Sequence, residues 1–197
     1  VALGERCLGL TAVGPALAVR ERDDAVRIAK ALGARHLLVE SHEIDDPRYR
    51  SNPVNRCYYC KGELYRLTEA KRQELGFCFV VDGTNLDDLA DHRPGHEAAR
   101  QWRVRSPLLE VGLGKVAVRE VARELGIDVW DKPASACLAS RVPYGTEVTV
   151  ERLRQIEALE VSLKDLGLRQ VRVRYHGPLA RIEVSQPEID LAFARRA

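Results

Sequence analysis

The hydrophobic and polar positions near the start of the chain predict two buried strands with a helix between them. Leu8–Val13 and residues 36–40 are short apolar runs of the kind found in strands that are covered on both faces of a sheet. Over residues 23–32 the apolar side chains recur at helical spacing, and Gly33 follows as a C-terminal cap. A strand, a helix and a strand in this order form a βαβ unit, whose crossover connection requires parallel strands. The pattern therefore predicts an α/β fold built on a parallel sheet.

The middle of the chain alternates predicted helices with long polar stretches. Residues 57–75 and 115–125 have helical periodicity, and residues 77–81 are a third apolar run that predicts a strand. Residues 41–56 and 86–105 lack periodicity, so we expect two long loops there. In a compact domain, loops of this length usually carry function or move.

The last part of the chain changes character. Residues 151–166 predict a long charged helix, and residues 171–175 and 181–185 alternate strictly between apolar and polar positions. Two alternating strands joined by a Gly-Pro turn make a half-exposed antiparallel hairpin, unlike the buried runs before it. We therefore expect a first domain over residues 1–145 and a smaller α+β domain over residues 146–197.

The composition is that of an ordinary soluble globular protein. Hydrophobic residues make up 45% and charged residues 30%, and the net charge is 31 − 29 = +2, which argues against bulk binding of nucleic acid. No apolar run approaches the roughly 20 residues of a membrane-spanning helix, and no signal segment opens the chain. We therefore expect a cytoplasmic protein with neither nucleic acid nor a membrane as partner. Methionine is absent even at position 1, so we expect the sequence to begin inside a longer gene product.

Five cysteines are an odd number without a secretory context, so metal, cluster or thiol chemistry is a better expectation than a disulfide framework. Cys57 and Cys60 form a CYYC pair at the start of a predicted helix, where the helix N-terminus lowers the pKa of a thiol. Such a pair can share a metal or a cluster, and it can also be a redox pair or two partly buried thiols. Cys7 and Cys78 lie in or beside apolar runs and are expected in the core.

Cys137 lies in residues 132–145, KPASACLASRVPYG, which we predict to be a shaped loop because prolines and a glycine interrupt it. Arg141, four residues on, could stabilise a thiolate or an anionic substrate. A lone cysteine is most often a small buried hydrophobic residue, and that alternative stays open. Cys137 could also join Cys57 and Cys60 around a [4Fe-4S] cluster, which would leave one iron able to bind an exogenous sulfur.

Two further stretches carry candidate ligand contacts. The DGTN turn at residues 82–85, with Asp87 and Asp88 after it, follows the carboxyl end of a predicted parallel strand, where open α/β sheets bind their ligands. Its carboxylates suit Mg²⁺ beside phosphates, although Gly, Asn and Asp also dominate ordinary turns. Arg172 and Arg174 lie two apart on a predicted strand and share one face, where they could clamp a phosphate or simply be solvated.

Several motifs, in order along nearly the whole chain, together resemble one family: NRCYYCK, DGTNLDD, HRPG, VRSPL, KPASACLASRVPYG, VRVRYH and ARIEV. The family is that of the LarE-type ATP-dependent sulfur transferases, which make the nickel-pincer cofactor of lactate racemase. Its members are PP-loop ATP pyrophosphatases with an α/β, adenine nucleotide alpha hydrolase-like domain. The resemblance implies that ATP adenylylates a carboxylate of pyridinium-3,5-biscarboxylic acid mononucleotide, a pyridinium dicarboxylate mononucleotide, and releases pyrophosphate. Sulfide or another sulfur donor then supplies the nucleophile that displaces AMP and leaves a thiocarboxylate.

The resemblance also implies roles for residues of this chain. The catalytic residues are expected to be Cys137 and Arg141. ATP, with Mg²⁺, is expected to contact Gly83, Thr84 and Asn85. The substrate is expected to contact Asp88, Arg93, Arg172, Arg174 and Arg181. A divalent metal is expected at Glu160 and Asp190. By the same resemblance we expect a homo-oligomer, specifically a hexamer.

The sequence departs from the family pattern at both ends. The family's SGGxDS phosphate loop follows its first strand, and this sequence begins after that point. We therefore expect the PP-loop domain at residues 1–145 to lack its first strand and phosphate loop. The second domain, residues 146–197, is expected to bind substrate or form the oligomer, and to be incomplete because the sequence stops inside a helix that begins near Pro187. Both ends are thus expected to be truncated.

The family delivers sulfur in two ways. Some members sacrifice the sulfur of one loop cysteine, which becomes dehydroalanine, whereas others carry three cysteines that hold a [4Fe-4S] cluster. Cys57, Cys60 and Cys137 resemble the three-cysteine pattern, so we predict the cluster, with a sacrificial Cys137 as the alternative. Two other functions compete with this one: a PP-loop tRNA thiolase with three cysteines, and a non-catalytic protein whose cysteines hold structural zinc.

Overall fold

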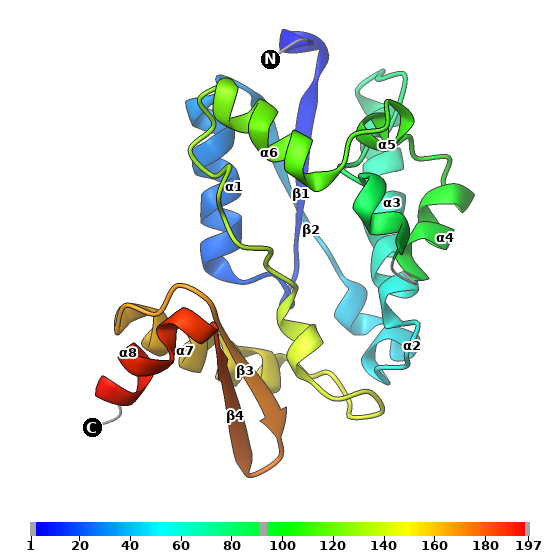
Figure 1. Cartoon of the computed structure of the whole chain (residues 1–197). Helices are drawn as coiled ribbons and strands as arrows, with labels where there is room; N and C mark the ends of the chain where they lie inside the picture. Colours follow the sequence, from blue (N-terminus) through cyan, green and yellow to red (C-terminus); the bar gives the residue numbers. More distant parts are fainter. Residues whose placement is uncertain (1–2, 91–93, 196–197) are drawn as a thin grey trace. The chain divides into compact units, whose positions relative to one another are not determined.

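The computed structural model describes residues 3–90 and 94–195, and the chain divides into two compact units. Unit 1 consists of Val1–Gly14, Val19–Glu43 and Val54–Lys132, and unit 2 consists of Pro15–Ala18, Ile44–Pro53 and Pro133–Ala197. The elements of both units are labelled in Figure 1.

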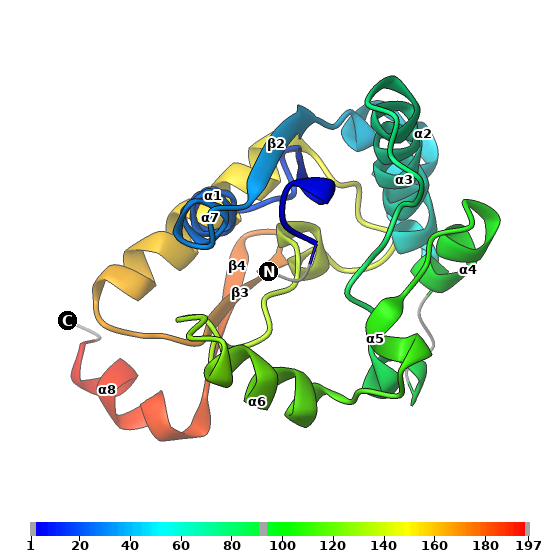
Figure 2. The same ribbon diagram turned by 90° about the horizontal axis from the view of Figure 1, so that it is seen from above.

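Unit 1 contains the predicted βαβ element. Strands β1 (Leu8–Val13) and β2 (Arg35–Glu40) pair in parallel, with Leu8 opposite Arg35 and Val13 opposite Glu40. Helix α1 (Val19–Ala31) connects them and lies against the pair (Figures 1 and 2). The predicted parallel pairing and the mixed α/β class are thus confirmed, and the helix starts earlier than the periodicity indicated.

Helices make up most of the remainder of unit 1. The longer ones are α3 (Arg56–Glu74), α4 (Pro94–Gln101) and α6 (Lys115–Glu124). Shorter pieces lie between or before them: η1 (Gly4–Arg6), η3 (Leu86–Ala90) and α5 (Pro107–Glu110). Helix α4 lies beside α3 (Figure 2). The two helices approach closely at Gly95, where a Cβ atom would lie only 3.0 Å from Cγ of Lys61, so this position requires glycine or a shift of the lysine.

The predicted third strand is reduced to a single bridge. Val81 pairs in parallel with Arg105, whose backbone N–H donates to the carbonyl of Val80 at 3.1 Å. Phe79 is 63% exposed, so the apolar run that predicted a strand is not covered by the described residues. Cys78 in this run is exposed as well, and so is Cys7, so the expectation that these two thiols lie in the core is wrong.

Unit 2 contains the predicted hairpin and its helix. Strands β3 (Val171–His176) and β4 (Leu179–Val184) pair antiparallel, with Val171 opposite Val184, which confirms the alternation (Figure 1). Helix α7 (Val150–Asp165) packs on β3, and Leu153 and Ile156 of the helix and Val171 and Val173 of the strand are buried. Helix α8 (Ile189–Ala194) follows the short turn η5 (Gln186–Glu188).

Unit 2 also takes in three segments that the sequence assigned to the first domain, of which Pro15–Ala18 is the first. Residues 133–145, expected in the first domain, belong to it and contain the turn η4 (Leu138–Arg141). Ile44–Pro53, part of the expected loop at 41–56, belongs to it as well and contains α2 (Pro47–Arg50), which is capped by the side chain of Asp46. The turn η2 (Glu43–Asp45) begins at the last residue of unit 1. The boundary thus differs from the expected one at 145, because hydrogen bonds tie these segments to one another. Among the described residues, no helix is long and apolar enough to cross a membrane.

Candidate functional site

The DGTN turn of unit 1 is organised by Asp82. One oxygen of its carboxylate accepts hydrogen bonds from Oγ of Ser106 at 2.7 Å and from the backbone N–H of Thr84 at 3.1 Å. The other accepts from the hydroxyl of Tyr65 at 3.0 Å. Burial pushes the pKa of Asp82 upward, but the hydrogen bonds from Ser106 and Thr84 outweigh it and hold the pKa below its usual range. Asp82 therefore fixes the turn as an ionised acceptor.

The acidic residues after the turn are engaged within unit 1. Oδ2 of Asp88 accepts from both the backbone N–H and the side-chain amide of Asn85, at 3.1 and 2.8 Å. Asp87 accepts from the backbone N–H of Lys115 at 2.5 Å, at the start of α6, where a carboxylate is favourable for the helix dipole. These contacts give Asp88 a role in shaping the loop, and its substrate contact stays a prediction.

Asp82→Asn is expected to reduce the free energy of unfolding by about 1–2 kcal/mol at pH 7, because hydrogen bonds to an ionised group become bonds to a neutral one. A carboxyl whose pKa is lowered by folding stabilises the protein above its unfolded pKa, about 3.9, and this contribution is lost as pH falls through the folded pKa. The difference between wild type and variant should therefore shrink below about pH 4. Urea unfolding of both proteins at pH 7 and at lower pH measures this difference in the free energy of unfolding.

Asp128→Asn, a change at an exposed carboxylate of the same unit, serves as the control and should alter stability by less than about 1 kcal/mol. A constant difference between wild type and Asp82→Asn across the whole pH range would contradict the ionised role of Asp82.

A pocket of about 910 Å³ lies beside the DGTN turn. Thr84 and Ser106, two of the residues that donate hydrogen bonds to Asp82, both line it. The start of α3 contributes Asn55 and Tyr58, and α4 contributes a polar wall that includes His96. Of the three residues expected to contact ATP, Thr84 is the one that lines this pocket, whereas Gly83 is exposed and Asn85 is held by Asp88. The nucleotide contacts stay a prediction.

Cys57 and Cys60 lie in the first turns of α3, as the sequence predicted. They are three residues apart, so their side chains lie on the same side of the helix, Cys57 exposed and Cys60 half-buried. All five cysteines lie within the described residues, and none of them forms a disulfide. The start of α3 thus presents two thiols in its first turns, one exposed and one half-buried.

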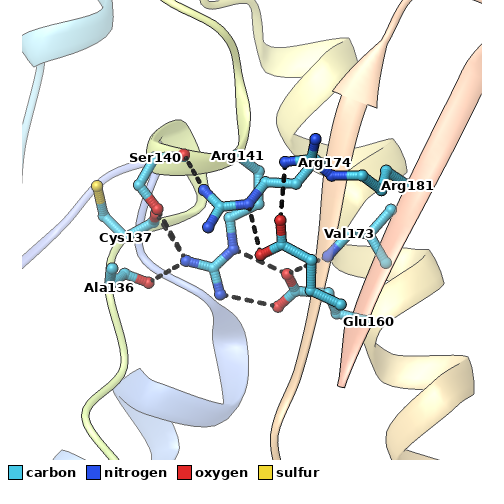
Figure 3. A network of polar contacts seen from close by, with 9 residues as sticks. Ala136, Cys137, Ser140, Arg141, Glu160, Val173, Arg174 and Arg181 are labelled. Carbon is cyan, nitrogen blue, oxygen red and sulfur yellow. Dashed lines mark hydrogen bonds and ion pairs between the residues drawn. The ribbon is translucent and has the colours of Figure 1, made fainter. Parts of the chain in front are cut away.

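Cys137 lies in unit 2 at the N-cap of η4 and is exposed. The backbone N–H of Leu138, next to it, donates to the carbonyl of Ala16 at 2.9 Å. Figure 3 shows the sulfur of Cys137 pointing away from the guanidinium of Arg141. The thiol is therefore accessible while its backbone is held, and the alternative of a buried packing residue is wrong. Because Cys57 and Cys60 belong to unit 1, convergence of the three sulfurs stays a prediction.

Arg141 is buried behind Cys137 and paired with Glu160 of α7. Its Nε and Nη2 donate to the two carboxylate oxygens at 2.8 and 3.2 Å, and both side chains are no more than 5% exposed (Figure 3). Its Nη1 donates to the carbonyls of Ala136 and Cys137, at 2.7 and 3.1 Å. Arg141 therefore binds the backbone of the cysteine segment, and its role as a catalytic cation stays a prediction.

Glu160 also bonds to the hairpin, because its Oε1 accepts from the backbone N–H of Val173 at 3.0 Å. The carboxylate therefore joins α7, β3 and η4 at one buried point. Asp190 is exposed in the first turn of α8. Within the described part of the chain, no three His, Cys, Asp or Glu side chains gather as a metal site would require. The metal at Glu160 and Asp190 stays a prediction, and the contacts of Glu160 give it a structural role.

The hairpin carries its arginines on the face opposite its buried valines. Arg174 donates to the carbonyl of Ser140 and to Glu183, both at 2.9 Å, and Arg181 donates to Glu183 at 2.8 Å (Figure 3). Arg172 is half-buried opposite Glu183, and its guanidinium makes no hydrogen bond or ion pair within the described residues. Three arginines against one glutamate leave this face with a charge of 3 − 1 = +2. Arg93, the remaining expected contact, lies outside the described residues.

Sequence reasoning missed two residues that shape these segments. Asp82 was taken as part of a turn, and Asn52 as part of a loop. Asn52 is fully buried at a positive φ of 55°, a conformation in which asparagine is enriched among residues other than glycine. The only local signal was the Ser-Asn-Pro sequence, which predicts a turn but not its partner.

Comparison with known proteins gives the chain its family. No family model matches it. The uncharacterised protein slr1717 of Synechocystis sp. is 46% identical over 187 residues, which make up 95% of this chain and 70% of that protein. The pyridinium-3,5-bisthiocarboxylic acid mononucleotide synthase of Lactiplantibacillus plantarum, a LarE protein, is 36% identical over 169 residues. The chain belongs to the LarE-like family.

The matches differ in how much of each protein they cover. The L. plantarum match covers 86% of this LarE-like chain but 61% of the synthase, less than two thirds of its length. A probable tRNA sulfurtransferase of Methanothermobacter thermautotrophicus is 30% identical over 86 residues, which are 42% of this chain and 22% of that protein. The resemblance found in the motifs is thus confirmed at the level of the family, and the cysteine subtype stays a prediction.

Proposed function

We propose that this LarE-like protein is an ATP-dependent sulfur transferase of nickel-pincer cofactor synthesis. The observation that carries the proposal is the similarity to the L. plantarum synthase over 86% of this chain. The substrate would be a pyridinium dicarboxylate mononucleotide, and the product its thiocarboxylate. An accessible cysteine beside a cationic hairpin face, both in unit 2, supports this choice.

The chemistry has two steps. A carboxylate oxygen attacks the α-phosphate of ATP, so that pyrophosphate leaves and an acyl-adenylate forms. A sulfur nucleophile then attacks the acyl carbon, the C–O bond to AMP breaks, and a thiocarboxylate remains. Adenylylation is needed because a free carboxylate is a poor acyl donor, and cationic groups stabilise the phosphate charge that develops.

Arg172 is the side chain best placed to hold the substrate phosphate. Its guanidinium has no intramolecular partner within the described residues, whereas Arg174 and Arg181 are already paired with Glu183. Arg174 also bonds the carbonyl of Ser140, three residues after Cys137. A phosphate on this face would therefore be fixed relative to the segment that carries the reactive thiol.

We further propose that Cys57, Cys60 and Cys137 hold a [4Fe-4S] cluster. Two observations support these ligands: Cys57 and Cys60 share one side of α3, and Cys137 presents an accessible sulfur. A cluster ligated by three thiolates supplies one iron that can bind an exogenous sulfide. Ligation of one cluster by these three cysteines, Mg²⁺ with ATP, and assembly into a homo-oligomer belong to the same proposal.

The test is an anaerobic assay of the full-length protein with ATP, Mg²⁺, sulfide and the dicarboxylate nucleotide. We expect release of AMP and pyrophosphate and a product whose mass corresponds to replacement of one carboxylate oxygen by sulfur. The same preparation is analysed for iron, acid-labile sulfide and zinc. Absence of ATP-dependent product contradicts the transferase function, and stoichiometric zinc without iron contradicts the cluster alone.

A tRNA thiolase is the second candidate, favoured by the similarity to the probable tRNA sulfurtransferase. It predicts binding of tRNA that weakens steeply with salt, because phosphate contacts release counterions. Titration of fluorescent tRNA at low and moderate salt separates the two candidates. The net charge of +2 leads us to expect no such binding.

A further inference from the structure

The side chain of Asn52 binds three backbone carbonyls of the segment that follows Cys137. Its Nδ2 lies 3.3 Å from the carbonyl oxygen of Val142, 2.7 Å from that of Pro143 and 2.9 Å from that of Thr146. An amide has two N–H groups, so three acceptors around one nitrogen require that one hydrogen be shared. The side-chain amide of Asn52 therefore donates hydrogen bonds to several backbone carbonyls of this segment.

The backbone of Asn52 adds to the same connection. The N–H of Gly145 donates to the carbonyl of Asn52 at 2.9 Å, and the N–H of Val148 donates to the carbonyl of Arg50 at 2.9 Å. Residues 50–52 thus act as a short template for residues 142–148, although about ninety residues separate them in sequence. Residues 50–52 are themselves held in place, because Arg50 is the last residue of α2 and the N-terminus of this helix is capped by Asp46.

Asparagine satisfies two requirements at this position. The backbone adopts a φ of 55°, which glycine and asparagine tolerate best. Glycine would also adopt this φ, but it has no side-chain amide. The second requirement is therefore a side-chain donor for the three carbonyls, which asparagine supplies. The side chain is fully buried, and a buried amide needs partners of this kind.

The segment that Asn52 holds continues directly from the turn that carries Cys137. On the other side of the turn, Arg141 binds the carbonyls of Ala136 and Cys137, and the N–H of Leu138 binds Ala16. The backbone on both sides of the cysteine is therefore anchored, whereas its side chain is exposed, and Figure 3 shows the sulfur pointing away from Arg141. The position of the sulfur follows from the backbone anchors.

We infer that Asn52 is a positioning residue for Cys137, acting through the carbonyls of residues 142, 143 and 146. The inference rests on the proposed function for its catalytic consequence. Without the amide, the segment that follows η4 loses these hydrogen bonds. The thiol of Cys137 then samples positions away from the adenylylated substrate. Small misplacements of a reacting group lower the rate of a bond-forming step without changing how the substrate binds.

The test uses the full-length protein with Asn52→Gly, which keeps the positive φ free of strain and removes the amide. Hydrogen exchange followed by mass spectrometry should show residues 136–148 exchanging about tenfold faster, with α7 and unit 1 unchanged. The rate constant of sulfur transfer should fall about tenfold or more, while the KM for ATP and the rate of pyrophosphate release stay at wild-type values. A purely structural role would slow both steps together.

Ser51→Ala is the matched control, because this neighbouring exposed hydroxyl contacts Arg48 and not the cysteine segment. It should leave both readouts unchanged. Unchanged exchange of residues 136–148 in Asn52→Gly overturns the inference whatever the activity. A wild-type protein without sulfur transfer refutes the proposed function instead, and the exchange result still decides the anchoring.

A measurement on the wild type covers the case in which Asn52→Gly does not fold. The amides of Leu138 and Gly145 should exchange with one common opening free energy, because one anchored segment holds both. Rapid exchange at Leu138 beside strong protection at Gly145 would overturn the inference, since the anchor would then not reach the cysteine.

Discussion

Cys137→Ala should reduce sulfur transfer by at least about a thousandfold, because it removes the sulfur on which either delivery mechanism depends. The first step does not use this thiol, so ATP-dependent release of pyrophosphate in the presence of substrate should continue. Cys137 is exposed at the start of η4, so the alanine replaces a solvent-accessible side chain and the fold should be retained. Thiocarboxylate formation and pyrophosphate release are measured in the same anaerobic assay.

Two further cysteine variants distinguish the cluster mechanism from the sacrificial mechanism and provide a control. Cys57→Ala should abolish transfer only if the sulfur passes through a three-cysteine cluster, whereas a sacrificial Cys137 would still complete one turnover. Cys78→Ala, another exposed thiol of unit 1, is the control and should retain wild-type activity. Transfer at the wild-type rate by Cys137→Ala would contradict both sulfur mechanisms.

Glu160→Ala should lower the free energy of unfolding of unit 2 by about 3–5 kcal/mol, because it leaves the guanidinium of Arg141 buried without its carboxylate. The backbone N–H of Val173 loses its acceptor at the same time. The effect should be the same in EDTA as in excess Mg²⁺, since the partner of Glu160 is an arginine. Urea unfolding followed by hydrogen exchange of α7 and the hairpin measures it.

Gln155→Ala on an exposed position of the same helix is the control, and it should change stability by less than about 0.5 kcal/mol. The double variant Arg141→Met with Glu160→Leu should recover much of the loss, because replacing both buried charges removes the unpaired ion. A wild-type stability that rises with Mg²⁺, beside a Glu160→Ala stability that does not, would favour the metal role instead.

The elements that the sequence predicted well are those with a strong period. The βαβ element and the β3–β4 hairpin were confirmed with their pairing directions, because buried runs and strict alternation report directly on the faces of a sheet. The run at residues 77–81 was equally apolar, yet it forms one bridge in the described structure. A local pattern of apolar residues predicts which side chains are buried. It does not predict which other strand the segment pairs with.

The site was harder to predict because its polar contacts join distant segments. Cys57, Cys60 and Cys137 stood out through their reactive chemistry, and Cys57 and Cys137 proved exposed. The pairing of Arg141 with Glu160 and the three bonds of Asn52 could not be inferred, because a hydrogen bond across many residues leaves no periodic trace. Arg141 was therefore expected to face a substrate, and the structure shows it bound to its own backbone.

Under the proposed cluster mechanism, sulfur leaves this protein without consuming Cys137. The most direct measurement combines product counting with the intact mass of the full-length protein after prolonged anaerobic turnover with ATP, substrate and sulfide. We expect more than one sulfur transferred per polypeptide and an unchanged protein mass. At most one sulfur per polypeptide, with a loss of mass corresponding to conversion of Cys137 to dehydroalanine, would contradict it.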